Sequence, residues 1–201
     1  MGLKDDMGYV TGQTPLSEEE MEGLLIPTIT TREELDEFEQ LNIQKAVEYY
    51  LIRRKFKTDK ILTEDFIMGV HKKMLSDVWA WAGQFRQSEK TIGISWHQVP
   101  IRLRQLLGDC RFWIENSTYS EEEIAIRFKH EMVAIHLFTN GNGRHSRLMA
   151  DIVMKHIFKK PKFTWGRNNL INKSEVRDTY IKALKKADNG DLKDLIAFAR
   201  S

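Results

Sequence analysis

The chain has 201 residues, of which 41% are hydrophobic and 30% are charged, and its formal net charge is +2 at pH 7. These values fit one globular domain with a sizeable core. The nearly balanced charge does not by itself require nucleic acid or an anionic membrane as a partner, so any anion site has to be local. The single cysteine, Cys110, excludes an intramolecular disulfide framework and a cysteine-rich zinc site, and it suits a reducing, cytoplasmic environment.

Helices are expected to dominate the fold. Only four prolines occur, and apolar residues recur at intervals of three and four over long stretches. No stretch approaches the roughly 18 apolar residues that span a bilayer, and the first ten residues lack the apolar core of a signal peptide, so we expect no membrane association. Residues 1–30 are expected to form an arm with a short helix over the acidic run 17–23.

Three capping boxes mark helix starts in chain order. In this pattern a Ser or Thr and a Glu three positions later satisfy each other's free backbone N–H groups. The second box predicts a long helix from Thr31 toward residue 50, and the third predicts a helix that ends at His136. Other apolar spacings predict helices from residue 63 toward 81, over 101–112, over 147–158, and a pair over 174–199 with a break at 189–190. The boxes are Ser17 with Glu20, Thr31 with Glu34, and Ser120 with Glu123.

Residues 91–100 form the one stretch with strand character. β-branched and aromatic residues surround Gly93, and the stretch ends at Pro100. This composition predicts a short β-hairpin or flap, with an ordinary loop as the alternative.

The segment HLFTNGNGRHSR, residues 136–147, carries the chemistry that the sequence offers. Asn-Gly pairs usually indicate a β-turn, but both flanks here have helical rather than strand periodicity. Glycines let successive backbone N–H groups converge, and the following helix adds its positive N-terminal end, so the loop is suited to an anion. Arg144 and Arg147 are three residues apart and are therefore neighbours that can clamp phosphate oxygens.

His136 stands immediately before this loop. A lone histidine at the end of an apolar helical face is more often structural, but next to an anion site it can accept a proton from a hydroxyl that attacks the bound phosphorus. Zinc is not expected, because His130, His136 and His145 match no common ligand spacing. The phosphate-binding pattern G-x-x-x-x-G-K-[ST] is also absent.

At these residues the sequence resembles the Fic family, whose signature is H-x-F-x-[D/E]-G-N-G-R-x-x-R. The resemblance extends from about residue 63 to 198 and includes WAGQFR at 81–86 and the segment 180–184. The opening residues resemble the subgroup called mobile mystery protein B. The resemblance implies a mainly α, Fic-type helical bundle with a small β-hairpin flap over the active-site loop. It also implies an N-terminal arm and helix over 1–50, a candidate for regulation, and a catalytic domain over 51–201.

The resemblance implies a protein adenylyltransferase that moves AMP from ATP to a Tyr, Ser or Thr hydroxyl of a target protein. His136 would be the general base, Phe138 would fix the loop, and Mg²⁺ would neutralise charge between the phosphates. Ile92, Gly93 and Ile94 would receive the target segment as an added strand. The phosphates would be held by Gly141, Asn142, Gly143, Arg144 and Arg147.

Asn140 departs from the family pattern, which has an acidic magnesium ligand at this position. An amide oxygen can coordinate Mg²⁺ but carries no charge, so metal affinity should fall. Two alternatives therefore stay open: transfer of another phosphate-containing group, and a regulatory phosphate-binding module with little turnover. A nucleic-acid binder is a third reading and is not expected, because short lysine runs are usually solvated; its residues would be Lys159, Lys160, Lys162 and Trp165.

Many family members carry an inhibitory helix with the pattern [ST]-x-x-x-E-[GN], whose glutamate pairs with the second arginine of the motif. A strict match is absent here. Glu22 is followed by glycine but lacks the Ser or Thr, and Glu34 follows Thr30 at the right spacing but precedes Leu35. Solvated acidic faces are the plainer reading of both. A toxin-like protein with a separate antitoxin-like regulator is therefore also open.

Overall fold

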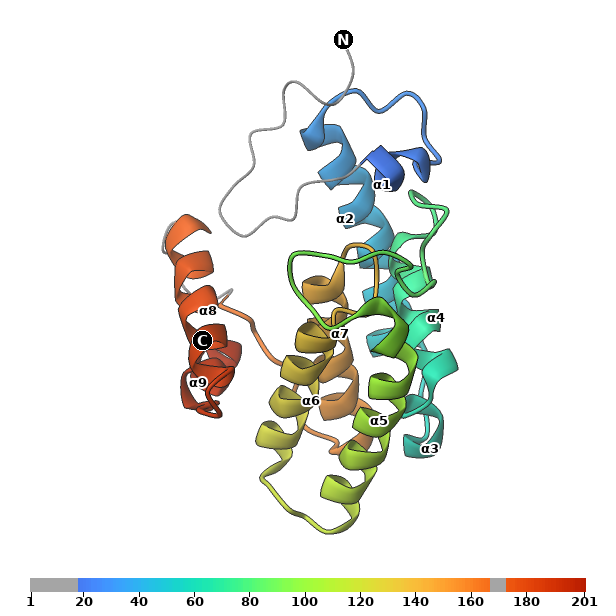
Figure 1. Cartoon of the computed structure of the whole chain (residues 1–201). Coiled ribbons are helices and arrows are strands. Elements are labelled where there is room, and N and C mark those ends of the chain that lie inside the picture. The colour runs from blue at the N-terminus through green and yellow to red at the C-terminus, as the bar shows by residue number, and fades with distance from the viewer. Residues whose placement is uncertain (1–17, 167–172) are drawn as a thin grey trace.

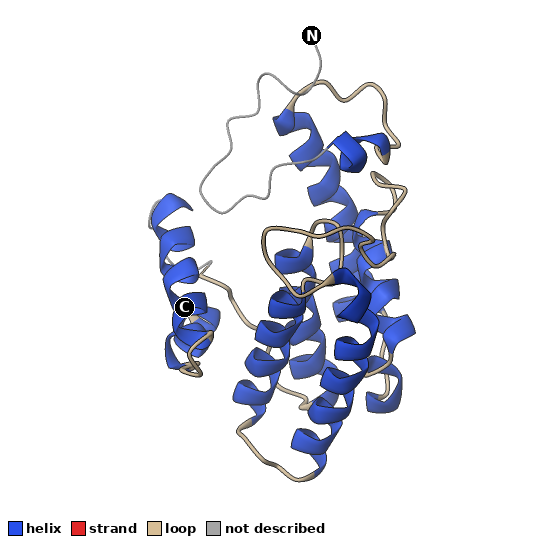
Figure 2. Ribbon diagram, viewed as in Figure 1, coloured by secondary structure: helices blue, strands red, loops and turns tan. Residues whose placement is uncertain are grey.

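The computed structural model describes residues 18–166 and 173–201, which form helices joined by loops (Figures 1 and 2). The predicted mainly helical fold is therefore confirmed. No helix in these ranges is long and apolar enough to cross a membrane. The α-helices are α1 (Glu18–Glu22), α2 (Arg32–Glu48), α3 (Thr58–Ile61), α4 (Glu64–Leu75), α5 (Val99–Glu115), α6 (Glu121–Ile135), α7 (Asn142–Ile152), α8 (Lys173–Ala187) and α9 (Lys193–Arg200), with π-helical turns Tyr49–Arg53 and Val153–Ile157 and a 3₁₀ turn Trp96–Gln98.

Side-chain caps begin the helices where the sequence predicts them. The Thr31 hydroxyl accepts the Glu34 N–H at 3.2 Å, and the Glu34 carboxylate accepts the Thr31 N–H at 3.1 Å, which confirms the box at the start of α2. The Ser120 hydroxyl accepts the Glu123 N–H at 3.2 Å and so caps α6, whereas the Glu123 carboxylate pairs with Arg127. Ser17, the predicted cap of α1, lies outside the described residues. Helix α4 ends at Leu75, earlier than predicted.

Helix α6 occupies the centre of the bundle. It packs against α5 on one side and α7 on the other, α7 contacts α4, and α4 contacts α2, while α9 packs on α6 and α8 (Figure 1). This order brings the C-terminal end of α6 and the N-terminal end of α7 together, with the loop 136–141 between them. Fully buried side chains fill the interior, among them Leu35, Ile67, Leu103, Phe128 and Met149.

Helix α2 is fixed to α4 by a buried amide. The Asn42 side chain donates to the Lys73 carbonyl at 3.1 Å and accepts the Asp77 N–H at 2.9 Å, so both ends of the amide bond to the last turn of α4 and the residues after it. The long helix predicted within residues 1–50 thus contacts the bundle directly. The division into an arm over 1–50 and a domain over 51–201 stays a prediction.

The predicted β-hairpin flap over residues 91–99 is wrong. Within the described residues no strand forms, and residues 91–94 make a series of bends (Figure 2). Pro100 does not end a strand but occupies the first turn of α5, where a missing N–H costs nothing because that group has no partner inside the helix. The β-branched residues here have no neighbouring strand with which to pair, so their propensity is not realised.

Candidate functional site

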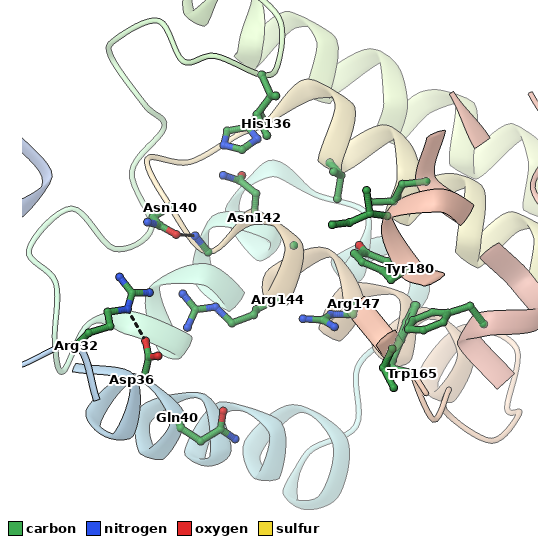
Figure 3. Close-up of a pocket in the computed structure, with 18 residues that line it drawn as sticks. Arg32, Asp36, Gln40, His136, Asn140, Asn142, Arg144, Arg147, Trp165 and Tyr180 are labelled. Carbon is green, nitrogen blue, oxygen red and sulfur yellow. Dashed lines mark hydrogen bonds and ion pairs between the residues drawn. The ribbon is translucent and has the colours of Figure 1, made fainter. Parts of the chain in front are cut away.

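A cavity of about 610 Å³ lies beside the loop between α6 and α7 (Figure 3). This volume is in the range of small-molecule sites. Helix α2 forms one wall, the loop and the first two turns of α7 form the centre, and α8, α9 and Trp165 form the opposite wall. The polar lining residues are Arg32, Asp36, Gln40, His136, Asn140, Asn142, Arg144 and Arg147.

His136 lies at the edge of this cavity with its imidazole directed toward the loop (Figure 3). It ends α6 in the left-handed conformation, with φ +57° and ψ +68°. The side chain is buried, and its Nδ1 has no hydrogen-bond partner among the described residues. Burial, together with the nearby cations Arg86 and Lys90, lowers the pKa of His136 to about 4. The imidazole is therefore neutral at pH 7 and has the lone pair that a general base needs.

Arg86 joins His136 to the loop that precedes α5. Its guanidinium is fully buried and donates to the carbonyls of His136 (2.6 Å), Ser88 (2.9 Å) and Ile94. Gly93 in the same loop has φ +104°, and a Cβ on it would lie 2.6 Å from the Cβ of His136. Gly93, one of the three residues predicted to dock a target, therefore lies directly against the predicted base, although these residues form no strand.

The loop after His136 ends at an open helix N-terminus. Gly141 precedes α7 with φ +76°, and no side chain caps the first N–H groups of this helix. Such groups attract anions, because they lack partners and lie at the positive end of the helix dipole. The Asn142 side chain closes the loop instead: it accepts the Phe138 N–H at 2.9 Å and donates to the Phe138 carbonyl at 2.7 Å. Only the main chain of Asn142 is free to contact a phosphate.

Two buried aromatic rings support this loop from below. The Phe138 ring stacks on the His71 ring with 3.7 Å between centroids. His71 Nδ1 accepts the Gly83 N–H at 2.9 Å, so the proton of the neutral ring is on Nε2, which donates to the Asn140 carbonyl at 3.0 Å. Burial holds the pKa of His71 well below its usual value, which keeps the ring neutral. His71 lies outside the motif and was not predicted as a site residue.

Asn140 is not arranged as a metal ligand. Its side-chain oxygen accepts the N–H of Gly141 at 2.6 Å. Within residues 18–166 and 173–201 no group of three or more His, Cys, Asp or Glu side chains could hold a metal ion.

Arg144 is anchored by a residue that the sequence analysis missed. Its guanidinium pairs with Glu39 of α2, and the other carboxylate oxygen of Glu39 accepts the indole N–H of Trp79 at 2.7 Å. The Glu39 side chain is only 4% exposed, whereas that of Arg144 is 32% exposed, so the arginine keeps an open side toward the cavity. Glu39 and Arg144 are 105 positions apart, and no local pattern indicates the pair.

Arg147 lies on the aromatic side of the cavity (Figure 3). Its guanidinium is 5.7 Å from the centre of the Tyr180 ring, and the Tyr180 hydroxyl accepts a hydrogen bond from Lys129 at 2.6 Å. Burial and Arg147 together lower the pKa of Lys129 to about 7. Trp165, considered above as part of a nucleic-acid surface, lines the same wall and donates its indole N–H to Asp151 at 3.1 Å.

Glu22 and Glu34 do not line the cavity. Glu22 is exposed on α1. The Glu34 carboxylate accepts the N–H groups of Thr30 and Thr31, and these hydrogen bonds lower its pKa. Glu34 therefore caps its own helix, and an inhibitory role for either glutamate stays a prediction.

Comparisons with known proteins agree with this geometry. Residues 61–154 match the model of the Fic/DOC family. The chain is 26% identical over 164 residues to a protein adenylyltransferase Fic of Aedes aegypti and 24% identical over 180 residues to protein adenylyltransferase fic-1 of Caenorhabditis elegans. These alignments cover 80% and 88% of the chain but only 31% and 33% of the relatives, so the chain spans about a third of their length.

Solved structures share the fold. Fic-1 of C. elegans has a TM-score of 0.64 at 23% identity, with 88% of this chain and 50% of that chain covered. The BepC protein of Bartonella tribocorum, solved with bound AMPPNP, has a TM-score of 0.64 at 15% identity, with 95% of this chain and 93% of that chain covered.

Proposed function

We propose that the chain is a protein adenylyltransferase of the Fic/DOC family, whose model matches residues 61–154, and that it moves AMP from ATP to a hydroxyl of a target protein. One observation carries this proposal: the neutral imidazole of His136 lies beside an uncapped helix N-terminus and two arginines in one cavity. The adenylyltransferases to which the chain is similar support the same chemistry.

The reaction assigns each group a step. The oxygen of a target Tyr, Ser or Thr attacks the α phosphorus of ATP, and His136 takes the hydroxyl proton. The bond between the α phosphorus and the bridging oxygen breaks, and pyrophosphate leaves. The N–H groups at the start of α7, with Arg144 and Arg147, stabilise the charge that spreads over the phosphate oxygens. The aromatic side chains of Trp165 and Tyr180 provide a surface on which the adenine ring of ATP can stack.

Magnesium does not fit the side chains of this pocket. The side-chain oxygen of Asn140 accepts a hydrogen bond from the Gly141 N–H, and the amide carries no negative charge. We therefore derive no step through the ion and expect any Mg²⁺ to bind chiefly to the nucleotide.

The target is proposed to dock on the loop of Ile92, Gly93 and Ile94. Ile92 is exposed and lines the cavity, and Gly93 lies against His136. A segment bound along this loop would bring its hydroxyl to the base without the β-hairpin that the sequence predicts. We also propose that a separate antitoxin-like protein controls the activity.

Two isotopic labels test the function. The purified chain is incubated with a cell extract and with ATP labelled either at the α or at the γ phosphorus. We expect protein labelling from the α label only, its loss in His136→Ala, and its retention in the control His97→Ala, an exposed histidine. Labelling from the γ phosphorus would instead show phosphoryl transfer, and α labelling that survives in His136→Ala would remove the assigned base.

A phosphate-binding module without turnover is the second candidate, and the side chain of Asn140 favours it. Such a module would show thermal stabilisation by ATP but no protein labelling. Asn140→Asp restores the acidic residue of the family motif, so labelling that appears only in this variant would support the second candidate.

A further inference from the structure

A third arginine, Arg32, lies in the cavity and comes from outside the family motif. It is the first residue of α2, and its side chain is 14% exposed. In the view of Figure 3 the guanidiniums of Arg32, Arg144 and Arg147 follow one another along one side of the cavity. Arg32 reaches from α2 toward the loop that carries Asn140.

Some N–H donors of the Arg32 guanidinium make no hydrogen bond within the described residues. Its buried Nη1 atom has no hydrogen-bond acceptor within residues 18–166 and 173–201, and its buried Nε atom has a carboxylate nearby that is not aligned for a hydrogen bond. Its ion-pair partner is Asp36, with Nε and Oδ1 2.9 Å apart, and the Asp36 side chain is 46% exposed. A cation in the first turn of a helix is also opposed by the helix dipole. A buried guanidinium with open donors, directed into a cavity, is suited to an anionic ligand.

We propose that Arg32 is a third phosphate-binding residue of the nucleotide site, supplied by α2. This inference rests on the proposed function and extends it to a residue before the segment 61–154. The planar guanidinium matches the spacing of phosphate oxygens, and among the residues that line the cavity three arginines face one carboxylate, Asp36. A magnesium ion held by one carboxylate adds one net positive charge beside the phosphates. Arg32 adds the same charge at a site where Asn140 supplies no acidic ligand.

Calorimetric titration with ATP and with adenosine tests this role. The Arg32→Gln variant loses one charge-assisted hydrogen bond to the phosphates. It should therefore bind ATP about tenfold more weakly than the wild type and bind adenosine equally well. Arg32→Lys keeps the positive charge but lacks the planar guanidinium, so its affinity for ATP should lie between those of the wild type and of Arg32→Gln. The control is Arg53→Gln, which removes an exposed arginine paired with Glu48 and should bind ATP like the wild type.

Asp36→Asn separates phosphate binding from a purely structural role. If the ion pair only stabilised α2, Asp36→Asn and Arg32→Gln would lose stability together and leave ATP affinity equally unchanged. If Arg32 binds phosphate, Asp36 competes for it, so Asp36→Asn should bind ATP more tightly than the wild type. If Arg32→Gln binds ATP as tightly as the wild type while Arg147→Gln loses binding, the role of Arg32 is overturned but the proposed function is not. A wild-type chain that does not bind ATP would overturn the proposed function as well.

Discussion

Replacement of Glu39 by alanine should destabilise the fold and release Arg144. Breaking a buried ion pair costs about 3–5 kcal/mol, but Arg144 is 32% exposed, so solvent screens part of the interaction and about 2–3 kcal/mol is a better value. The buried hydrogen bond from Trp79 is lost as well, at about 1 kcal/mol. The sum of about 3–4 kcal/mol corresponds to a melting temperature roughly 6–16 °C lower for a chain of this size.

Thermal and chemical denaturation of matched variants checks this value. Glu37→Ala removes an exposed glutamate from the same helix and should change the free energy of unfolding by less than about 0.5 kcal/mol. A double-mutant cycle of Glu39→Ala with Arg144→Ala isolates the energy of the pair, which should exceed about 1 kcal/mol. If Glu39→Ala melts like Glu37→Ala, or if the coupling energy is near zero, Glu39 does not anchor the arginine.

Two further predictions concern the surroundings of His136. Gly93→Ala places a Cβ 2.6 Å from the Cβ of His136 at φ +104°, so the transfer rate should fall at least about tenfold, whereas Gly108→Ala, with no atom within 4 Å, should be neutral. Nuclear magnetic resonance should show His136 titrating near pH 4 in the free protein, because burial and cations disfavour the imidazolium, and at higher pH when anionic ATP is bound. A midpoint near 6.5 in the free protein would show that the ring is not buried beside Arg86.

Local sequence signals predicted the helices well because their causes are local. The cap of α2 joins Thr31 to a residue three positions away, and the break before α9 coincides with Gly190 at φ +88°. The strand prediction over 91–99 failed because strand propensity needs a partner strand, which the sequence cannot guarantee. In the fold, Arg86 binds the carbonyls of this stretch, and the conformation of Gly93 is set by its contact with His136.

The motif likewise predicted which residues would gather in the cavity, but not how each is used. His136, Gly141, Gly143, Arg144 and Arg147 all line it, because they lie in the loop between α6 and α7 or in the first two turns of α7. The side chain of Asn142 instead holds the loop closed.

Helix α2 shows why the remainder of the site could not be read from the motif. Arg32 and Glu39 are both on this helix, one with open donors toward the cavity and one holding Arg144 from the buried side. Their positions depend on the packing of α2 against α4, which Asn42 fixes through hydrogen bonds to residues more than 30 positions away. The charge of the cavity therefore depends on a helix outside residues 61–154. A change that loosens α2 should alter nucleotide affinity even where every residue of the motif is intact.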